Sequence, residues 1–338
     1  MNSISSSKSI NLSGNLSVPG DKSISHRSLI IGSLVSGRIE INNLLESEDV
    51  IATAEALKIL GIKINKLNDK WEVFGSGIGN FFGSNYTLNL GNSGTGARLL
   101  MGLVAGSDVE ATFIGDKSLS KRPMKRVTAP LKKTGAIIVG QTDNLPIKIR
   151  GSKIPLPIKY QSPISSAQVK SCILLAGLSS LGNTTIIEPS LSRDHTERML
   201  KFFGASISTY ELDDMSWEIT LEGIPELKPL NLSIPADPSS AAFPIVSAII
   251  TPNSEIKVEN VCINELRTGL YKTLIEMGAN IQIFNEKEIS GEMVADITAS
   301  SSSLKGITVP KSRAASMIDE YPILSIAATR ATGKTVME

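Results

Sequence analysis

The residues best suited to chemistry lie at the starts of expected helices, and the first group follows the Pro19-Gly20 turn. Lys22, Ser23 and Arg27 fall within about one and a half turns of the helix that should begin there. Free N–H groups and the helix dipole favour an anion at a helix N-terminus. A lysine and an arginine one turn apart add charge-assisted donors, so this opening predicts an anion site. On these residues alone, a capped helix with solvated charges is the simpler alternative.

A second opening combines three glycines with polar residues. The segment LGNSGTGARLL (90–100) contains Asn92, Gly94 and Thr95, and Arg98 should lie in the first helical turn. Glycines allow the backbone to approach a ligand closely. The spacing lacks both the Gly-Lys-Ser/Thr ending of a phosphate loop and the G-x-G-x-x-G order of a dinucleotide site. A tight turn therefore explains the segment as well as a binding loop does.

A third segment, GDKSLSKRPMKRV, carries five cations within ten residues: Lys117, Lys121, Arg122, Lys125 and Arg126. Like charges this close repel one another, so an anionic ligand would stabilise the segment. Pro123 should hold Arg122 in extended or turn backbone. A solvated basic loop remains the alternative interpretation.

Two hydroxyls and an amide mark the next opening, SPISSAQVKS. Ser165, Ser166, Gln168 and Lys170 gather at the start of a helix. Neither serine has an assigned histidine or aspartate partner, so a hydrolase triad is unsupported.

The remaining openings contribute candidate bases. LSRDHTERML places Arg193 and His195 at the start of a helix, and for His195 we favour a capping or surface role over a catalytic one. SMIDEYPIL places Asp319 and Glu320 just before Pro322. Carboxylates at a helix N-terminus are ordinary capping residues, but these two occupy the same repeat position as the other openings.

The chain repeats, and the repeats must position these residues. The segments LKILGIKI, LKKTGAII, LKFFGASI and LIEMGANI each predict a helix end, a glycine and a strand. Their glycines, Gly61, Gly135, Gly204 and Gly278, are spaced by 74, 69 and 74 residues. Apolar helices rich in small residues, each followed by a strand, alternate with these segments. One module is therefore helix–strand–helix–strand–strand.

The opening helices are apolar nearly all round, which predicts that they are interior, with sheets packed around them. If every opening lies on the same side of its module, all of them can converge on one cleft. The fifth module begins near Asp319 and reaches Glu338 after one helix and one strand. We therefore expect the chain to be truncated.

Composition excludes several classes. The chain has 338 residues, 41% of them hydrophobic, with 34 lysines and arginines against 33 aspartates and glutamates. This argues against disorder and against a surface coated in basic charge for nucleic acid. No apolar stretch approaches the roughly 20 residues of a membrane span, and the N-terminus lacks the apolar core of a signal peptide. Two cysteines and two histidines build neither a disulfide framework nor a zinc site. We expect a cytoplasmic, metal-independent protein of two domains.

Seven motifs together resemble the enolpyruvyl transferases, in particular the EPSP synthase group: GDKSISHR, LGNSGTGARLL, GDKSLSKRPM, SSAQVKS, SRDHTERM, ADPSSAAF and MIDEYP. The resemblance implies an α/β (α+β) fold, a two-domain inverse α/β barrel built from repeated βαβαββ-like units of about 70 residues, with the last units missing. It places residues 1–18 plus 237–338 in the first domain and the three units of 19–236 in the second.

The resemblance also implies an activity. Members transfer the enolpyruvyl group of phosphoenolpyruvate to the 5-hydroxyl of shikimate 3-phosphate and release phosphate. The reaction is an addition–elimination through a tetrahedral intermediate, in the shikimate pathway to chorismate and the aromatic amino acids. It implies no cofactor, no metal, no nucleic acid or membrane partner, and a monomer.

Site residues follow from the matched motifs. The resemblance assigns to shikimate 3-phosphate the residues Lys22, Ser23, Arg27, Ser165, Ser166, Gln168, Arg193 and Asp319. It assigns to phosphoenolpyruvate the residues Lys22, Asn92, Gly94, Arg122 and Gln168. Lys22 and Asp319 are the catalytic residues, with Asp319 accepting the proton of the 5-hydroxyl.

One departure and two alternatives qualify the resemblance. The family continues with a Lys-Glu-x-Asp-Arg segment and further cations that clamp phosphoenolpyruvate, so we expect this polypeptide alone to be inactive or very weak. The sister group acting on UDP-N-acetylglucosamine carries a reactive cysteine before its Arg-Pro, whereas residues 115–124 contain none. A non-catalytic protein binding anions or RNA ends on this fold would leave Asp319 without a role.

Overall fold

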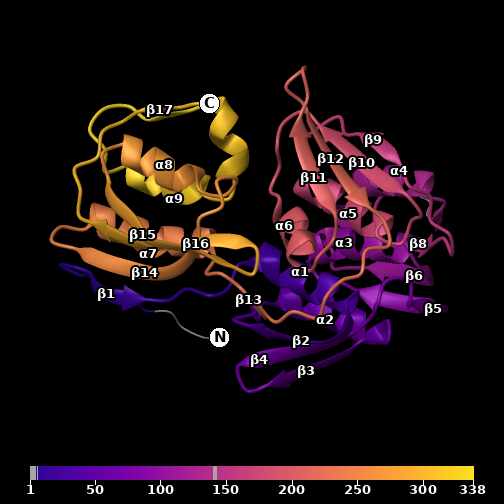
Figure 1. The fold of residues 1–338 in the computed structure, drawn as a ribbon. Coiled ribbons are helices and arrows are strands. Elements are labelled where there is room, and N and C mark those ends of the chain that lie inside the picture. Colours follow the sequence, from indigo (N-terminus) through magenta and orange to yellow (C-terminus); the bar gives the residue numbers. More distant parts are fainter. Residues whose placement is uncertain (1–4, 6, 140–142) are drawn as a thin grey trace. The chain divides into compact units, whose positions relative to one another are not determined.

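The chain folds into two compact units in the computed structural model, which describes residue 5 and residues 7–139 and 143–338 (Figure 1). Unit 1 contains the described residues up to Asp21 together with those from Pro235 to Glu338, and unit 2 spans Lys22–Ile234. The chain therefore passes from unit 1 to unit 2 and returns once.

The described residues of unit 2 form three four-stranded sheets of one design. A leading strand pairs in parallel with the second strand, and an antiparallel hairpin completes each sheet. The first sheet and its helices are β13 (Leu232–Ser233), α1 (Lys22–Ser33), β2 (Ser36–Asn42), α2 (Glu48–Ile59), β3 (Lys63–Leu67) and β4 (Lys70–Ser76). The second group is β5 (Phe82–Asn89), α3 (Gly94–Ala105), β6 (Asp108–Ile114), η1 (Leu119–Lys121), α4 (Lys125–Lys133), β7 (Ile137–Val139) and β8 (Ile147–Arg150). The third is β9 (Lys159–Gln161), α5 (Ala167–Gly177), β10 (Asn183–Glu188), α6 (His195–Phe202), β11 (Ile207–Glu211) and β12 (Trp217–Glu222).

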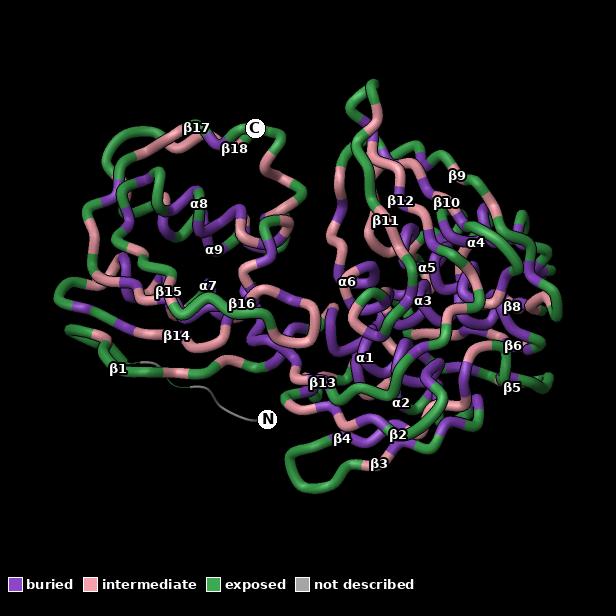
Figure 2. The backbone as a smooth tube through the Cα atoms, in the orientation of Figure 1, coloured by how far each residue is buried: buried purple, intermediate pink, exposed green. Residues whose placement is uncertain are grey.

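The helices α1, α3 and α5 form the interior of unit 2 (Figure 2). Small residues let two of them approach closely, because a Cβ at Gly102 of α3 would lie 2.2 Å from the carbonyl oxygen of Cys172 in α5. Any larger residue at Gly102 would therefore separate the two helices. The prediction that the opening helices are interior is correct for these three.

The second helix of each module ends as its glycine predicts. Gly61, Gly135, Gly204 and Gly278 follow α2, α4, α6 and α8 with φ angles of 95°, 94°, 99° and 97°. This left-handed conformation, which glycine adopts without steric cost, reverses the chain into the next strand. The repeated helix–glycine–strand pattern is confirmed in all four modules.

In unit 1 the part of the chain that the structure describes forms one sheet of the same design, in the order β1-β14-β16-β15, and a small parallel pair, β17 and β18. Its elements are β1 (Ser13–Leu16), α7 (Pro238–Ile250), β14 (Glu255–Cys262), α8 (Gly269–Glu276), β15 (Asn280–Ile289), β16 (Glu292–Ser300), β17 (Thr308–Val309), η2 (Lys311–Ser316), α9 (Tyr321–Ala328) and β18 (Val336–Met337). The N-terminal strand β1 thus completes the sheet of the fourth module by pairing with β14, while β13 completes the sheet of the first module by pairing with β2.

The prediction of interior opening helices is only partly correct in unit 1. Phe243 of α7 and Ile326 of α9 are 58% and 48% exposed. One four-stranded sheet and one two-stranded sheet, among the described residues, cover less of these helices than three sheets cover in unit 2. None of the helices formed by the described residues is both long and apolar enough to span a membrane.

Candidate anion-binding site

The openings of α3 and α5 meet through an arginine and a glutamine. Arg98, in the first turns of α3, is only 8% exposed, and its Nη1 donates to Oε1 of Gln168 at 2.6 Å. Gln168 in turn donates from Nε2 to Oγ1 of Thr95 at 2.9 Å. These bonds orient the amide of Gln168 and join the two helix N-termini, both of which favour anions.

A second arginine approaches the same place. Arg122 donates to the side-chain oxygen of Asn92 and, at 3.4 Å, to Oγ of Ser118. A Cβ at Gly94 would lie 2.9 Å from Nη1 of Arg122 and 3.0 Å from Nη1 of Arg98. Both guanidinium groups therefore lie against the backbone of Gly94, and the absence of a side chain there makes this possible. Arg122 has the extended backbone that Pro123 predicts, with φ −79° and ψ 133°.

The positive charge of Arg98 lies close to the positive charges of Arg122 and Arg126. Burial, together with the positive charges of Arg126 and Arg122, lowers the pKa of Arg98 below its ordinary value. Repulsion of this kind is relieved when an anion binds between the charges. The cluster is thus prepared for a phosphate or carboxylate group.

The opening of α1 is joined to those of α5 and α6 by Arg27. This residue is 3% exposed, and its Nε and Nη2 donate to Oγ1 of Thr196 and Oγ of Ser171 at 2.7 and 2.8 Å. Its Nη1 donates to the carbonyl of Ser23 at 2.8 Å. Lys22 is half exposed, with Nζ 3.4 Å from a carboxylate oxygen of Asp49.

A polar contact between α1 and α2 reaches the opening of α3. Nδ1 of His26 lies 2.8 Å from Oγ1 of Thr53, and a Cβ at Gly96 would lie 2.4 Å from the same hydroxyl. Together with the bonds of Arg27 and Gln168, this contact links the N-terminal parts of α1, α3 and α5, which open the three modules of unit 2.

The fourth predicted group lies beside the loop that enters α6. Oγ of Ser165 donates to the carbonyl of Ser190 at 2.6 Å and accepts from the backbone N–H of Ser190 at 3.0 Å. Ser166 occupies the N-cap position of α5. Arg193, partly exposed, lies in the same loop as Ser190.

Two residues near these openings differ from the sequence-based picture. For His195 we predicted a capping or surface role. The residue is fully buried, so the surface alternative is wrong, and the first turn of α6 faces the interior of unit 2. Lys170 is also buried, and it lies between the carboxylates of Glu188 and Glu197. Its charge is neutralised inside the protein rather than presented to a ligand.

Asp319 lies in unit 1, in the turn between η2 and α9. Its side chain is exposed, whereas the adjacent Glu320 is buried and accepts a hydrogen bond from Ser239. Because Asp319 and the cations belong to different units, their convergence on one cleft stays a prediction.

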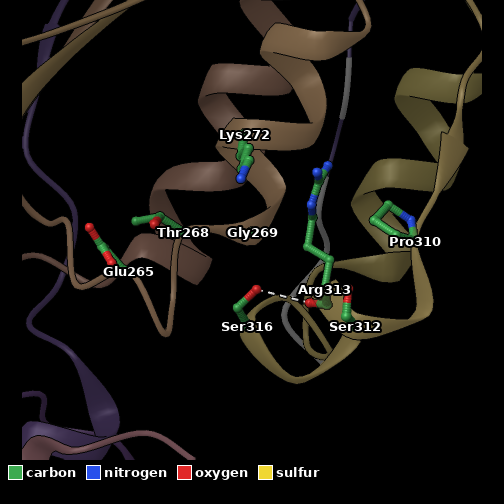
Figure 3. Close-up of a pocket in the computed structure, with 8 residues that line it drawn as sticks. All are labelled: Glu265, Thr268, Gly269, Lys272, Pro310, Ser312, Arg313 and Ser316. Carbon is green, nitrogen blue, oxygen red and sulfur yellow. Dashed lines mark hydrogen bonds between the residues drawn. The ribbon is translucent and has the colours of Figure 1, made fainter. Parts of the chain in front are cut away.

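A pocket of about 630 Å³ opens beside η2, the helix that leads to Asp319 (Figure 3). Its lining includes Lys272, Arg313 and Ser316. Figure 3 shows Arg313 rising from η2 toward the helix that carries Lys272. The segment before Asp319 therefore borders a pocket with polar and charged side chains in its lining.

The residues that the sequence assigns to the two substrates omit Arg98 and Arg126, whose charges the structure brings close together. Arg98 lies in the first turns of a helix that opens with glycines, and Arg126 lies in the basic segment. For Arg98 the available signal was the spacing of glycine, arginine and helix start, and for Arg126 it was the density of cations in the basic segment.

These features define a class, namely an α/β protein of repeated four-stranded sheets whose arginines gather beside a glycine at a helix N-terminus. A profile of the family described as EPSP synthase (3-phosphoshikimate 1-carboxyvinyltransferase) matches residues 7–338. The chain belongs to the EPSP synthase family.

Close relatives extend this finding. The chain is 54% identical over 328 residues to the 3-phosphoshikimate 1-carboxyvinyltransferase of Parvibaculum lavamentivorans, covering 96% of this chain and 73% of the relative. It is 52% identical over 335 residues to that of Bartonella quintana, covering 99% of this chain and 76% of the relative. A solved EPSP synthase from Acinetobacter baumannii superposes with a TM-score of 0.88 at 41% identity, covering 97% of this chain and 73% of that one. The predicted family is confirmed, as is a mixed α/β fold of repeated four-stranded sheets.

Proposed function

We propose that this chain is a 3-phosphoshikimate 1-carboxyvinyltransferase, which transfers the enolpyruvyl group of phosphoenolpyruvate to the 5-hydroxyl of shikimate 3-phosphate. The observation that carries the proposal is the cluster of Arg98, Arg122 and Arg126, in which a buried guanidinium is faced by other cations. Substrates with two phosphates and two carboxylates require such a cluster, because fixed cations in a site shielded from water stabilise charge better than water does.

The proposal divides the openings between the two substrates. The shikimate 3-phosphate group consists of Lys22, Ser23, Arg27, Ser165, Ser166, Gln168 and Arg193, with Asp319. The phosphoenolpyruvate group consists of Lys22, Asn92, Gly94, Arg122 and Gln168. Gln168 belongs to α5, as the neighbouring Ser166 does at its N-cap, and it bonds to Arg98 and Thr95 beside Gly94 of α3, which supports its place between the two groups.

The chemistry assigns Asp319 and Lys22 to catalysis. Asp319 takes the proton of the 5-hydroxyl as that oxygen attacks C2 of phosphoenolpyruvate, whose methylene carbon gains a proton. The tetrahedral intermediate then loses a proton from the resulting methyl group and expels phosphate, which forms the enolpyruvyl ether. Lys22 and the arginines stabilise the charge on the departing phosphate.

An inverse α/β barrel with domains 1–18 plus 237–338 and 19–236 is part of the proposal, as are a monomeric state and a cytoplasmic location. The common design of the four-stranded sheets and the interior helices of unit 2 support the barrel. Size-exclusion chromatography with light scattering tests the monomer.

Ligand-induced thermal stabilisation tests the function. A ligand that binds only the folded state stabilises it by about 2.7 kcal/mol at a hundred times its Kd. We expect shikimate 3-phosphate to raise the unfolding temperature and phosphoenolpyruvate to add to the rise. A response to UDP-N-acetylglucosamine would favour the sister activity, and a response to RNA ends alone would favour a non-catalytic protein.

The catalytic strength of the 338-residue polypeptide is a separate prediction. We expect it to release little or no phosphate from the two substrates. A coupled phosphate assay on the purified chain measures this, and turnover at a rate ordinary for an enzyme would contradict it.

A further inference from the structure

Lys170 is the most completely buried cation of unit 2, with its side chain 1% exposed. Its Nζ lies 2.9 Å from Oε1 of Glu188 and 2.7 Å from Oε1 of Glu197. It also donates to the carbonyl of Ser192 at 3.1 Å. One ammonium group thereby joins the opening of α5, the end of β10 and the first turn of α6.

The carboxylate of Glu188 also stabilises the loop between β10 and α6. Glu188 accepts from the backbone N–H of Ser192 at 2.8 Å and from its Oγ at 2.8 Å, so residues 188–192 form a closed turn. Lys170 holds this turn from the other side through the carbonyl of Ser192. The turn contains Ser190, the partner of Ser165, and Arg193 follows directly.

Lys170, Glu188 and Glu197 form a charged triad in the interior, and the burial of its charges costs desolvation energy. Burial acts against the charge of Lys170, but the carboxylates of Glu197 and Glu188 outweigh it and raise the pKa of Lys170. Apolar side chains of the same size would often give equal or greater stability at such a position. What they cannot give is three directed bonds that select one loop conformation.

We propose that Lys170 is a positioning residue that fixes the 188–193 loop so that Ser165 and Arg193 face the phosphate of shikimate 3-phosphate. This inference rests on the proposed function. Lys170 itself does not touch the substrate, because its Nζ is enclosed by Glu188, Glu197 and the carbonyl of Ser192. It acts through the loop.

The experiment measures the affinity of the 338-residue chain for shikimate 3-phosphate by calorimetry in a double-mutant cycle. Lys170→Met should weaken binding at least tenfold in the wild-type background. In the Arg193→Ala background it should weaken binding less than threefold, because the residue that the loop positions is already absent. Lys170→Arg should restore part of the affinity. Lys159→Met is the matched control, since Lys159 pairs with Glu218 at 3.0 Å on the same sheet but is 66% exposed.

A milder variant covers the case in which Lys170→Met fails to fold. Ser192→Ala removes the hydroxyl bonds to Glu188 and keeps the charged triad, and it should weaken binding about threefold without lowering the unfolding temperature much. Unchanged affinity in the folded variants, or equal losses with and without Arg193, would overturn the positioning role while wild-type binding left the proposed function standing. Absence of binding by the wild-type chain would overturn both.

Discussion

Two buried arginines show opposite electrostatic surroundings. Arg267 in unit 1 is 3% exposed and bonds to Asp21 at 2.7 Å, to Asp237 at 3.2 Å and to Ser239 at 2.9 Å. Burial opposes its charge, but the two carboxylates outweigh burial and raise the pKa of Arg267. Arg98 in unit 2 is 8% exposed, and burial together with two neighbouring arginines lowers its pKa.

Burial of a cation alone therefore does not mark a binding site. A buried cation between carboxylates has its charge satisfied by the fold, and removing it leaves like charges facing each other. A buried cation that is faced by cations is destabilised until an anion arrives. The first kind should therefore govern stability, and the second kind should govern ligand binding.

The largest effect is expected from Arg267→Met. The change leaves Asp21 and Asp237 buried without their cation, which should lower the free energy of unfolding by about 3–5 kcal/mol. Urea denaturation followed by circular dichroism measures the loss. Lys58→Met is the control, because Lys58 and its partner Glu55 are both exposed and the loss of this pair should shift the urea midpoint little.

The pH dependence of this variant sharpens the result. In the wild type, burial and the nearby Asp21 already raise the pKa of Asp237 against the pull of Arg267. Without Arg267 the folded state should bind protons more readily than the unfolded state, so its stability should recover as the pH falls from 7 toward 5. A loss that stays constant over this range would show that packing, rather than charge, explains the effect.

The next effect concerns binding. Arg122→Ala should weaken phosphoenolpyruvate, measured with shikimate 3-phosphate present, by about tenfold to a hundredfold, the range of one or two charge-assisted hydrogen bonds. Shikimate 3-phosphate measured alone should weaken far less. Lys121→Ala, an exposed cation in the same segment, is the control. Equal losses for both ligands would contradict the assignment of Arg122.

Arg126→Ala should change stability and ligand affinity in opposite directions. Because the charges of Arg126 and Arg122 lower the pKa of the buried Arg98, removing Arg126 should raise the unfolding temperature of the free protein slightly. The same change should weaken phosphoenolpyruvate by about threefold to tenfold, since Arg98 then carries the site with one cation fewer. Stability and affinity that fall together would show that Arg126 serves the fold.

The sequence predicted the scaffold because its determinants are local. A helix end at Gly61 or Gly204 requires only a few neighbouring residues, and the openings follow from the same period. Which cation receives a carboxylate is not local, since Asp21 and Arg267 are 246 positions apart. For that reason the sequence placed Lys170 with the helix openings, although the structure encloses it between two carboxylates.

The smallest expected effect separates the contribution of burial to the stability of an ion pair from the contribution of hydrogen-bond geometry. Arg313 holds Glu276 with two bonds, at 2.7 and 2.8 Å, but the glutamate side chain is 41% exposed. The hydrogen bond from Arg313 lowers the pKa of Glu276, so the pair should stabilise the fold above pH 4.5 and lose this contribution as the pH falls through the folded-state pKa. Glu276→Gln should therefore cost only about 0.2–1 kcal/mol at pH 7, and less at pH 3.5, measured by urea denaturation at each pH. A loss as large as that of Arg267→Met would mean that paired geometry, and not burial between carboxylates, sets the stability of these cations.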